Sequence, residues 1–98
     1  MSQKHERIRE RVRELVADYL VRELPPSAGL VSVTRVELSK DGSTARVYYS
    51  VLPEEKAPEL ERFLNERKRE LQRLVSSLRV RVVPKLEFVR EEHPHGAL

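Results

Sequence analysis

Basic side chains are concentrated in one part of this 98-residue chain. Residues 61–81 carry seven Lys or Arg against three Glu, a net charge of +4, whereas the net charge of the whole chain is +3. A local excess of this kind favours a polyanionic partner, because Lys and Arg contact phosphates whatever the base sequence. The alternative is a solvated helix face, and charge alone favours the two interpretations equally.

Other chemistry has little support in the residue pattern. The chain has no cysteine, which excludes disulfides and thiol catalysis and fits a reducing compartment. Its three glycines are far apart, so no Gly-rich phosphate loop is present. His93 and His95, with Glu91 and Glu92 nearby, have the wrong spacing for two ligands on one helix and make only a weak metal site. We therefore expect no catalytic residue, no metal and no cofactor.

Aromatic side chains are few, with two Phe and three Tyr in the chain. Tyr48 is predicted on the outer face of a strand and could stack on a base, although packing across the strands is the commoner role for such a residue. So few rings argue against an extended stacking surface. Contacts of Arg and Lys with phosphates, together with recognition of shape, are the expected mode of binding to a polyanionic partner.

A β-hairpin over residues 30–52 is the element that must position the rest. Two β-branched runs flank the polar centre 39–43, where Asp-Gly suits a chain reversal. The apolar residues of the first strand, 31–38, change phase halfway along, and a β-bulge near Thr34 would repair the alternation.

Two amphipathic helices are predicted to cover this hairpin. The first, over residues 4–24, ends where Pro25 and Pro26 remove two backbone donors. The second is predicted over residues 58–77, and its apolar stripe passes through Arg67. Burying an unpaired guanidinium is costly, so either Arg67 reaches solvent along its aliphatic stem or the helix bends at this point.

A third strand is predicted over residues 79–89, where RVRVVPKLEFV alternates, with Pro84 placing it at an edge. The order is then α-β-β-α-β, an α+β fold with a three-stranded mixed sheet and both helices on one face. We expect strand three to lie beside strand one and parallel to it. The predicted outer face of the sheet carries Arg35, Arg46, Tyr48, Arg79 and Arg81. The predicted core includes Leu15, Val47, Leu71, Val82 and Phe88.

Three segments, in order, resemble the bacterial ribosome-binding factor A family. Val36–Asp41 matches its V-x-[ML]-S-x-D pattern, Ala45–Tyr48 matches A-x-V-[YF], and Leu78–Phe88 resembles [LI]-R-x-[VI]-P-x-[LI]-x-F. The separations are similar too, and the resemblance extends over about residues 7–90.

The resemblance implies a single type II KH-like RNA-binding domain, residues 1–90, followed by a short polar tail, 91–98. It implies contact with 16S ribosomal RNA, a role in maturation of the 30S small subunit, and no enzymatic activity. In this family an Ala-x-Gly helix kink replaces the KH GxxG loop. It would fall on Arg67-Lys68-Arg69, where the small residues are absent. The family's longer C-terminal extension is missing or reduced to Arg90–Leu98.

The expected function is therefore that of a ribosome-binding factor that binds structured rRNA and assists 16S rRNA processing. The predicted RNA-facing residues are Arg67, Lys68, Arg69, Arg73, Arg79 and Arg81, with Arg46 and Lys40 at the rim. The alternative is a KH-like protein- or RNA-interaction module with a non-ribosomal partner. We expect a monomer in the cytoplasm with no small-molecule substrate. No apolar run reaches about 18 residues, and the charged N-terminus lacks a signal core, so neither membrane insertion nor secretion is expected.

Overall fold

The computed structural model describes residues 2–92, and its side chains from residue 5 onward. The weak metal hypothesis at His93 and His95 therefore falls outside the described residues. The elements are α1 (Ser2–Glu23), β1 (Leu30–Leu38), β2 (Thr44–Leu52), α2 (Ala57–Ser76) and β3 (Lys85–Arg90). Short 3-10 turns, Pro26–Ala28 and Glu54–Lys56, precede β1 and α2. The predicted order α-β-β-α-β is confirmed.

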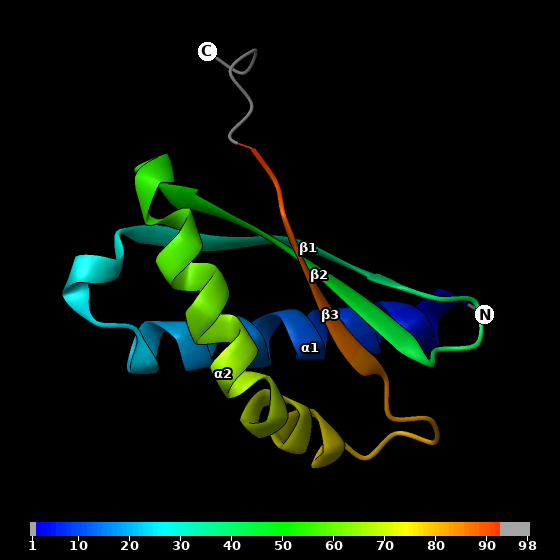
Figure 1. Cartoon of the computed structure of the whole chain (residues 1–98). Helices are drawn as coiled ribbons and strands as arrows, with labels where there is room; N and C mark the ends of the chain where they lie inside the picture. Colours follow the sequence, from blue (N-terminus) through cyan, green and yellow to red (C-terminus); the bar gives the residue numbers. More distant parts are fainter. Residues whose placement is uncertain (1, 93–98) are drawn as a thin grey trace.

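The sheet has the order β1-β2-β3, so β2 is its central strand (Figure 1). β1 pairs with β2 antiparallel, and β3 pairs with β2 in parallel, from Thr44↔Lys85 to Tyr49↔Arg90. The mixed sheet is confirmed, but the prediction that strand three pairs with strand one is wrong. Helix α2 connects β2 directly to β3, and such a β-α-β unit pairs its own two strands in parallel.

The third strand is shorter than predicted, because residues 79–84 form a loop. The alternation of this segment is typical of a strand, but β2 begins only at Thr44, opposite Lys85. Residues before Lys85 therefore extend past the end of the central strand and have no partner there. Val82, predicted in the core, lies in this loop and is 42% exposed.

The core lies between the inner face of the sheet and the two helices. Val47 and Leu71 are fully buried as predicted, whereas Leu15 and Phe88 are partly buried at its margin. The predicted bulge is confirmed, because the β1–β2 register shifts between Val33 and Arg35. The shift lets apolar residues from both halves of β1 pack against the core cluster.

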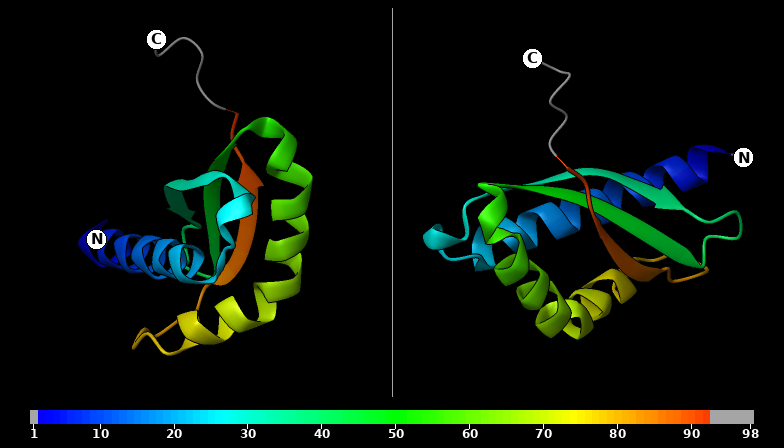
Figure 2. Two further views of the ribbon diagram at one scale, coloured as in Figure 1. Left: turned by 90° about the vertical axis from the view of Figure 1, so that its left-hand side faces the viewer. Right: turned by 45° about the horizontal axis from the view of Figure 1, so that its top comes forward.

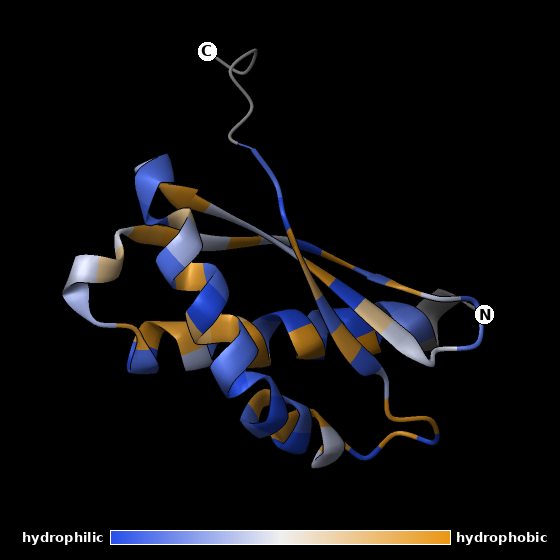
Figure 3. Ribbon diagram, in the orientation of Figure 1, coloured by the Kyte–Doolittle hydropathy of each residue, from blue (hydrophilic) through white to orange (hydrophobic). Residues whose placement is uncertain are grey.

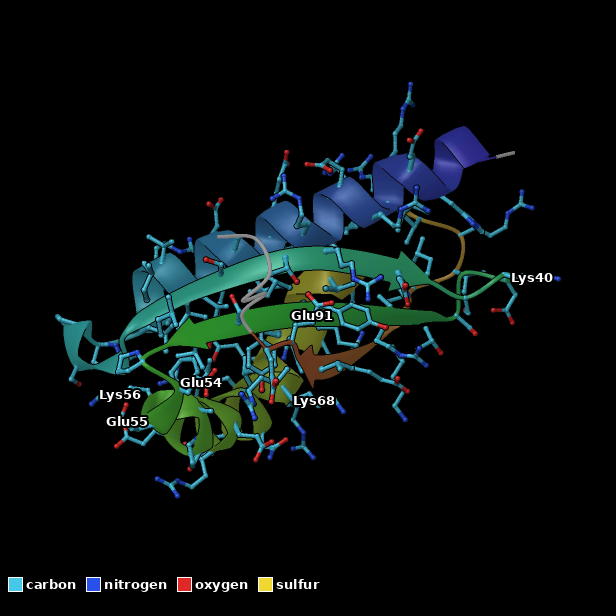
Figure 4. All side chains as sticks on the ribbon, turned by 90° about the horizontal axis from the view of Figure 1, so that it is seen from above. Lys40, Glu54, Glu55, Lys56, Lys68 and Glu91 are labelled. Carbon is cyan, nitrogen blue, oxygen red and sulfur yellow. The ribbon has the colours of Figure 1, made fainter. Side chains whose placement is uncertain are left out.

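Both helices lie on the same side of the sheet, as predicted. Figure 4 looks onto the uncovered face, with α1 beneath β1 and α2 beneath the other side of the sheet. Residues 57–76 are assigned as one continuous helix, yet its ribbon changes direction about halfway along (Figures 1 and 2). The helix therefore bends without being interrupted. None of the described helices is long and apolar enough to cross a membrane.

Gly29 lies where the chain turns into β1, at φ 90° and ψ −169°, a backbone conformation that is nearly exclusive to glycine. A Cβ at this position would lie 2.5 Å from the backbone oxygen of Leu52. Gly42, at φ 76° in the hairpin turn, has room for a Cβ, whose nearest neighbouring atom would be 3.8 Å away.

We predict that Gly29→Ala lowers the free energy of unfolding by roughly 2–3 kcal/mol, because it combines backbone strain with a clash against main chain. Gly42→Ala, the matched control, meets strain without the clash and should cost about 1 kcal/mol. Urea denaturation of the two variants measures both values. Equal losses would show that the close approach to Leu52 contributes nothing.

Candidate nucleic-acid interface

Three of the predicted RNA-facing residues, Lys68, Arg69 and Arg73, form what we call the α2 basic face. Arg69 and Arg73 are exposed, and Lys68 is half-buried. Within residues 5–92, none of the three takes part in an ion pair. Their charges are therefore available to a ligand. Figure 4 shows Lys68 reaching outward from the α2 side of the molecule.

Arg67 is engaged inside the protein. Its Nη1 donates to the hydroxyl of Tyr19 at 3.0 Å and to Glu23 Oε1 at 3.4 Å, and it lies 3.9 Å from Glu70 Oε1. The guanidinium carbon lies 4.7 Å from the centre of the Phe63 ring. Arg67 therefore extends out of the core along its stem, and the helix also bends, so both alternatives offered by the sequence occur together.

Tyr19 is the buried half of this contact between α1 and α2. It is 1% exposed, and its hydroxyl donates to Glu70 Oε1 at 2.9 Å while accepting from Arg67. Burial raises the pKa of the Tyr19 phenol. The neutral hydroxyl thus joins a carboxylate and a guanidinium of α2, which makes Arg67 a structural tie between the helices.

The arginines of the uncovered sheet face are paired with carboxylates. Arg46 Nε lies 3.5 Å from Glu87 Oε1, and its Nη1 lies 3.9 Å from Glu37 Oε1. Arg35 contacts Glu37 at 2.6 Å and Glu91 at 3.1 Å. Two guanidiniums thus face three carboxylates. The rim position predicted for Arg46 lies in this network of ion pairs rather than on a surface of excess positive charge.

Tyr48 belongs to the same network. Its hydroxyl donates to Glu37 Oε1 at 2.8 Å, and this hydrogen bond lowers the pKa of the Glu37 carboxyl. The guanidinium carbon of Arg35 lies 3.9 Å from the centre of the Tyr48 ring. One face of the ring is therefore covered, which supports the cross-strand packing role over base stacking.

Lys40 lies at the tip of the β1–β2 hairpin, far from Lys68 in Figure 4, so the two do not share one patch. Next to it, the Asp41 carboxylate accepts hydrogen bonds from the Ser43 hydroxyl at 2.7 Å, the Ser43 amide at 3.1 Å and the Ser39 hydroxyl at 2.9 Å. These bonds lower the pKa of Asp41 from 3.8 to about 2. The turn is thus fixed by an ionised carboxylate at neutral pH.

Arg79 and Arg81 line a groove that the sequence did not predict. Three distant segments enclose it: the first turns of α1, the hairpin turn and the loop after α2. Its volume is about 660 Å³. We call it the α1–loop groove; its lining is His5, Arg7, Ile8, Arg11, Asp41, Gly42 and residues 77–82.

The α1–loop groove combines positive charge with apolar surface. Its four arginines, Arg7, Arg11, Arg79 and Arg81, are exposed, and no ion pair involves them in the described part of the chain. Ile8 and three residues of the loop supply aliphatic surface. Only the fold brings α1 to this loop, so no local sequence signal marks the groove.

The α2 basic face leads towards this groove. Arg69, Arg73 and Ser77 recur every four residues and so form one row along the helix surface. Ser77, the C-cap of α2, lines the groove. The predicted residues thus divide into two adjoining basic regions, two positions, Arg67 and Arg46, that are paired within the protein, and Lys40, which lies apart at the hairpin tip. Within residues 2–92, no group of three or more His, Asp or Glu could hold a metal ion.

Comparisons with known proteins agree with the motifs. The family model described as ribosome-binding factor A matches residues 4–97. A protein of that name from Carboxydothermus hydrogenoformans is 39% identical over 93 residues, covering 92% of this chain and 74% of the relative. Another from Coxiella burnetii is 35% identical over 94 residues, covering 94% of this chain and 79% of the relative.

Solved structures resemble the fold as well. The crystal structure of ribosome-binding factor A from Thermus thermophilus aligns with a TM-score of 0.68 at 28% identity, covering 87% of this chain and 93% of that one. A Thermus thermophilus ribosome-binding factor A homology model, fitted into a cryo-EM map of a 30S complex, gives 0.67 at 32% identity, covering 83% and 88%. These neighbours confirm the predicted KH-like fold.

We predict that Arg67→Ala lowers the free energy of unfolding, by a small amount because the guanidinium is partly exposed to solvent. The loss arises because the buried hydroxyl of Tyr19 loses a donor and the two helices lose their charged tie. Arg69→Ala, two positions further along α2, should be close to neutral. Thermal and urea melts of both variants test this, and equal stabilities would refute a structural role for Arg67.

We predict that the Asp41 carboxyl titrates with a pKa of about 2 and that Ser43→Ala raises it. The pKa of the folded state is depressed, so the stability contributed by this carboxylate is complete above pH 3.8 and lost as the pH falls towards 2. NMR titration of the side-chain carboxyl carbon measures the pKa directly. An unchanged pKa in the variant would show that the Ser43 hydroxyl does not stabilise the ionised form.

Proposed function

Because this chain belongs to the ribosome-binding factor A family, we propose that it binds the 30S small ribosomal subunit and assists its maturation, including processing of 16S rRNA. The proposal includes direct contact with the RNA by a monomer in the cytoplasm, without enzymatic activity. The name of the family and a relative fitted into a 30S complex support it.

The observation that carries the proposal is the uneven distribution of unpaired positive charge. On the sheet face, the guanidiniums of Arg35 and Arg46 are matched by carboxylates. The α2 basic face and the arginines of the α1–loop groove have no such partners among the described residues. Phosphates would replace water at these side chains without first breaking an ion pair.

The expected binding mode follows from this distribution. RNA phosphates would contact α2 from Lys68 to Arg73 and continue onto Arg79 and Arg81. Contacts of this kind release counterions, so the affinity should fall steeply as salt rises. The sheet face, where the arginines are paired with carboxylates, would remain outside the main contact, with Arg46 and Lys40 at most at the rim of that contact.

We predict that reversing Lys68, Arg69 and Arg73 to Glu weakens binding to immature small subunits by at least about tenfold at moderate salt, since several phosphate contacts become repulsive. The melting temperature should change little, because the three side chains form no ion pair within the described residues. Sedimentation of the protein with subunits at several salt concentrations measures the effect.

The matched control reverses Arg22, Arg62 and Arg90, three exposed residues outside both basic regions, and changes the net charge equally. It should retain most of the affinity. If both triple variants lose the same affinity, only net charge matters and the assigned surface is wrong. If the parent chain itself does not bind subunits or their RNA, the proposed function is wrong.

The role in processing is tested by whether the chain lowers the amount of unprocessed 16S rRNA in cells that lack their own family member.

A further inference from the structure

The α1–loop groove has a basic surface and an aliphatic surface, and a contact with phosphates alone would need only the first. Its arginines can hold phosphates, but Ile8, Leu78, Val80 and Val82 line the same space with aliphatic groups. In Figure 3 the loop between α2 and β3 is coloured mostly as hydrophobic, although it lies at the edge of the molecule. Covering exposed aliphatic side chains with an apolar ligand surface removes them from water, and this burial favours binding.

Hydrogen bonds fix the C-terminal end of the loop that lines the groove. The side chain of Gln72 spans the end of the loop: its Nε2 donates to the carbonyl of Pro84 at 2.8 Å, and its Oε1 accepts from the amide of Leu86 at 2.9 Å. The amide of Lys85 donates to the carbonyl of Ser43 at 2.8 Å, which fixes the loop against the hairpin turn. Much of the ordering that binding would otherwise require is therefore already present.

The size and charge of the groove fit a nucleotide. Its volume of about 660 Å³ is in the range of small-ligand sites. Four arginines face a single carboxylate, that of Asp41, which is already bound by two serines. This charge favours a polyanion, while the aliphatic lining favours a flat, weakly polar group beside the phosphates. An unpaired base attached to its sugar-phosphate backbone supplies both.

Double-stranded RNA does not satisfy the same surface. In an A-form helix the bases are stacked inside, and a protein reaches mainly phosphates and the shallow minor groove. A duplex would contact the arginines and leave the aliphatic residues in water. Unpaired nucleotides expose their bases, which pack on side chains and on guanidinium planes.

We infer that the α1–loop groove binds an unpaired nucleotide of single-stranded RNA, with its base against Val80 and Val82 and its flanking phosphates on Arg79, Arg81, Arg7 and Arg11. This inference deepens the proposed function and depends on it, since it assigns a single-stranded segment of the bound RNA to one place on the protein. The α2 basic face then supplies sequence-independent phosphate contacts on the same partner.

The experiment uses the full chain and two probes at one salt concentration: a labelled oligouridylate of about 12 nucleotides and an RNA duplex of about the same length. Fluorescence anisotropy gives both affinities. The chain should bind the single strand more tightly than the duplex. Amide NMR shifts on adding the oligouridylate should include residues 7–11 and 78–82.

Val82→Ser and Val83→Ser form a matched pair, because the two residues are adjacent, are 42% and 40% exposed, and only Val82 lines the groove. Val82→Ser should weaken single-strand binding roughly three- to tenfold, the effect of losing the burial of one valine, and leave duplex binding unchanged. Val83→Ser should change neither. Equal effects of the two variants would overturn the inference.

Replacing Arg79 and Arg81 by Gln should weaken binding of the single strand and flatten its salt dependence by about 0.7 for each phosphate that is no longer bound. Lys85→Gln, an exposed cation outside the groove, is the control.

If the parent binds immature subunits but prefers duplex, or if Val82→Ser binds normally, the groove assignment fails while the proposed function stands. If polyglutamate displaces the oligouridylate and binds as tightly, the groove is a site for acidic peptides and the inference is wrong. If no RNA or subunit binds, the proposed function itself fails.

Discussion

The parallel pairing of β3 with β2 determines where the chain can present charge. Lys85 lies opposite Thr44, the first residue of β2. The residues between the end of α2 and Lys85 therefore lie beyond the end of the central strand. The segment 79–84 must therefore form a loop although its residues favour a strand. Gln72 satisfies the backbone at the point where the ladder stops, through its bonds to Pro84 and Leu86. The same register places the loop against the hairpin turn and α1, and so creates the groove.

Ion pairing separates the arginines that hold this fold together from the cations of the two basic regions. Arg35, Arg46 and Arg67 each lie within 4 Å of a carboxylate and join elements that are distant in the sequence. Partly exposed pairs of this kind contribute little stability individually, but they fix side chains and cancel the local field. The cations of the α2 basic face, and Arg79 and Arg81 of the following loop, lack such partners among the described residues. A count of basic residues alone would have given both groups the same weight.

Most of the architecture could be predicted from local patterns, because these patterns reflect local physics. The hairpin, both helices and the bulge at Thr34 follow from alternation, helical stripes and turn residues. The partner of strand three could not be read in this way, since its pairing depends on how α2 crosses the sheet. The sequence leaves the role of Arg67 open, because it does not show that Tyr19 approaches it. The groove cannot be predicted from the sequence for the same reason: Arg7 and Arg81 line one groove only in the folded chain.

The bend in α2 forms without the small residues that the family has at its helix kink, and side-chain contacts hold it instead. The small residues expected at a family kink are absent at residues 67–69, yet the ribbon still turns about halfway along. Two sets of contacts hold the two halves in different directions. Arg67 and Phe63 tie the first half to Tyr19 of α1, while Gln72 ties the second half to the start of β3. A straight helix would have to give up one of these anchors. The polar ends of the long Arg67 and Gln72 side chains thus hold a bend that small residues would merely permit, and the bend directs the row from Arg69 to Ser77 towards the groove.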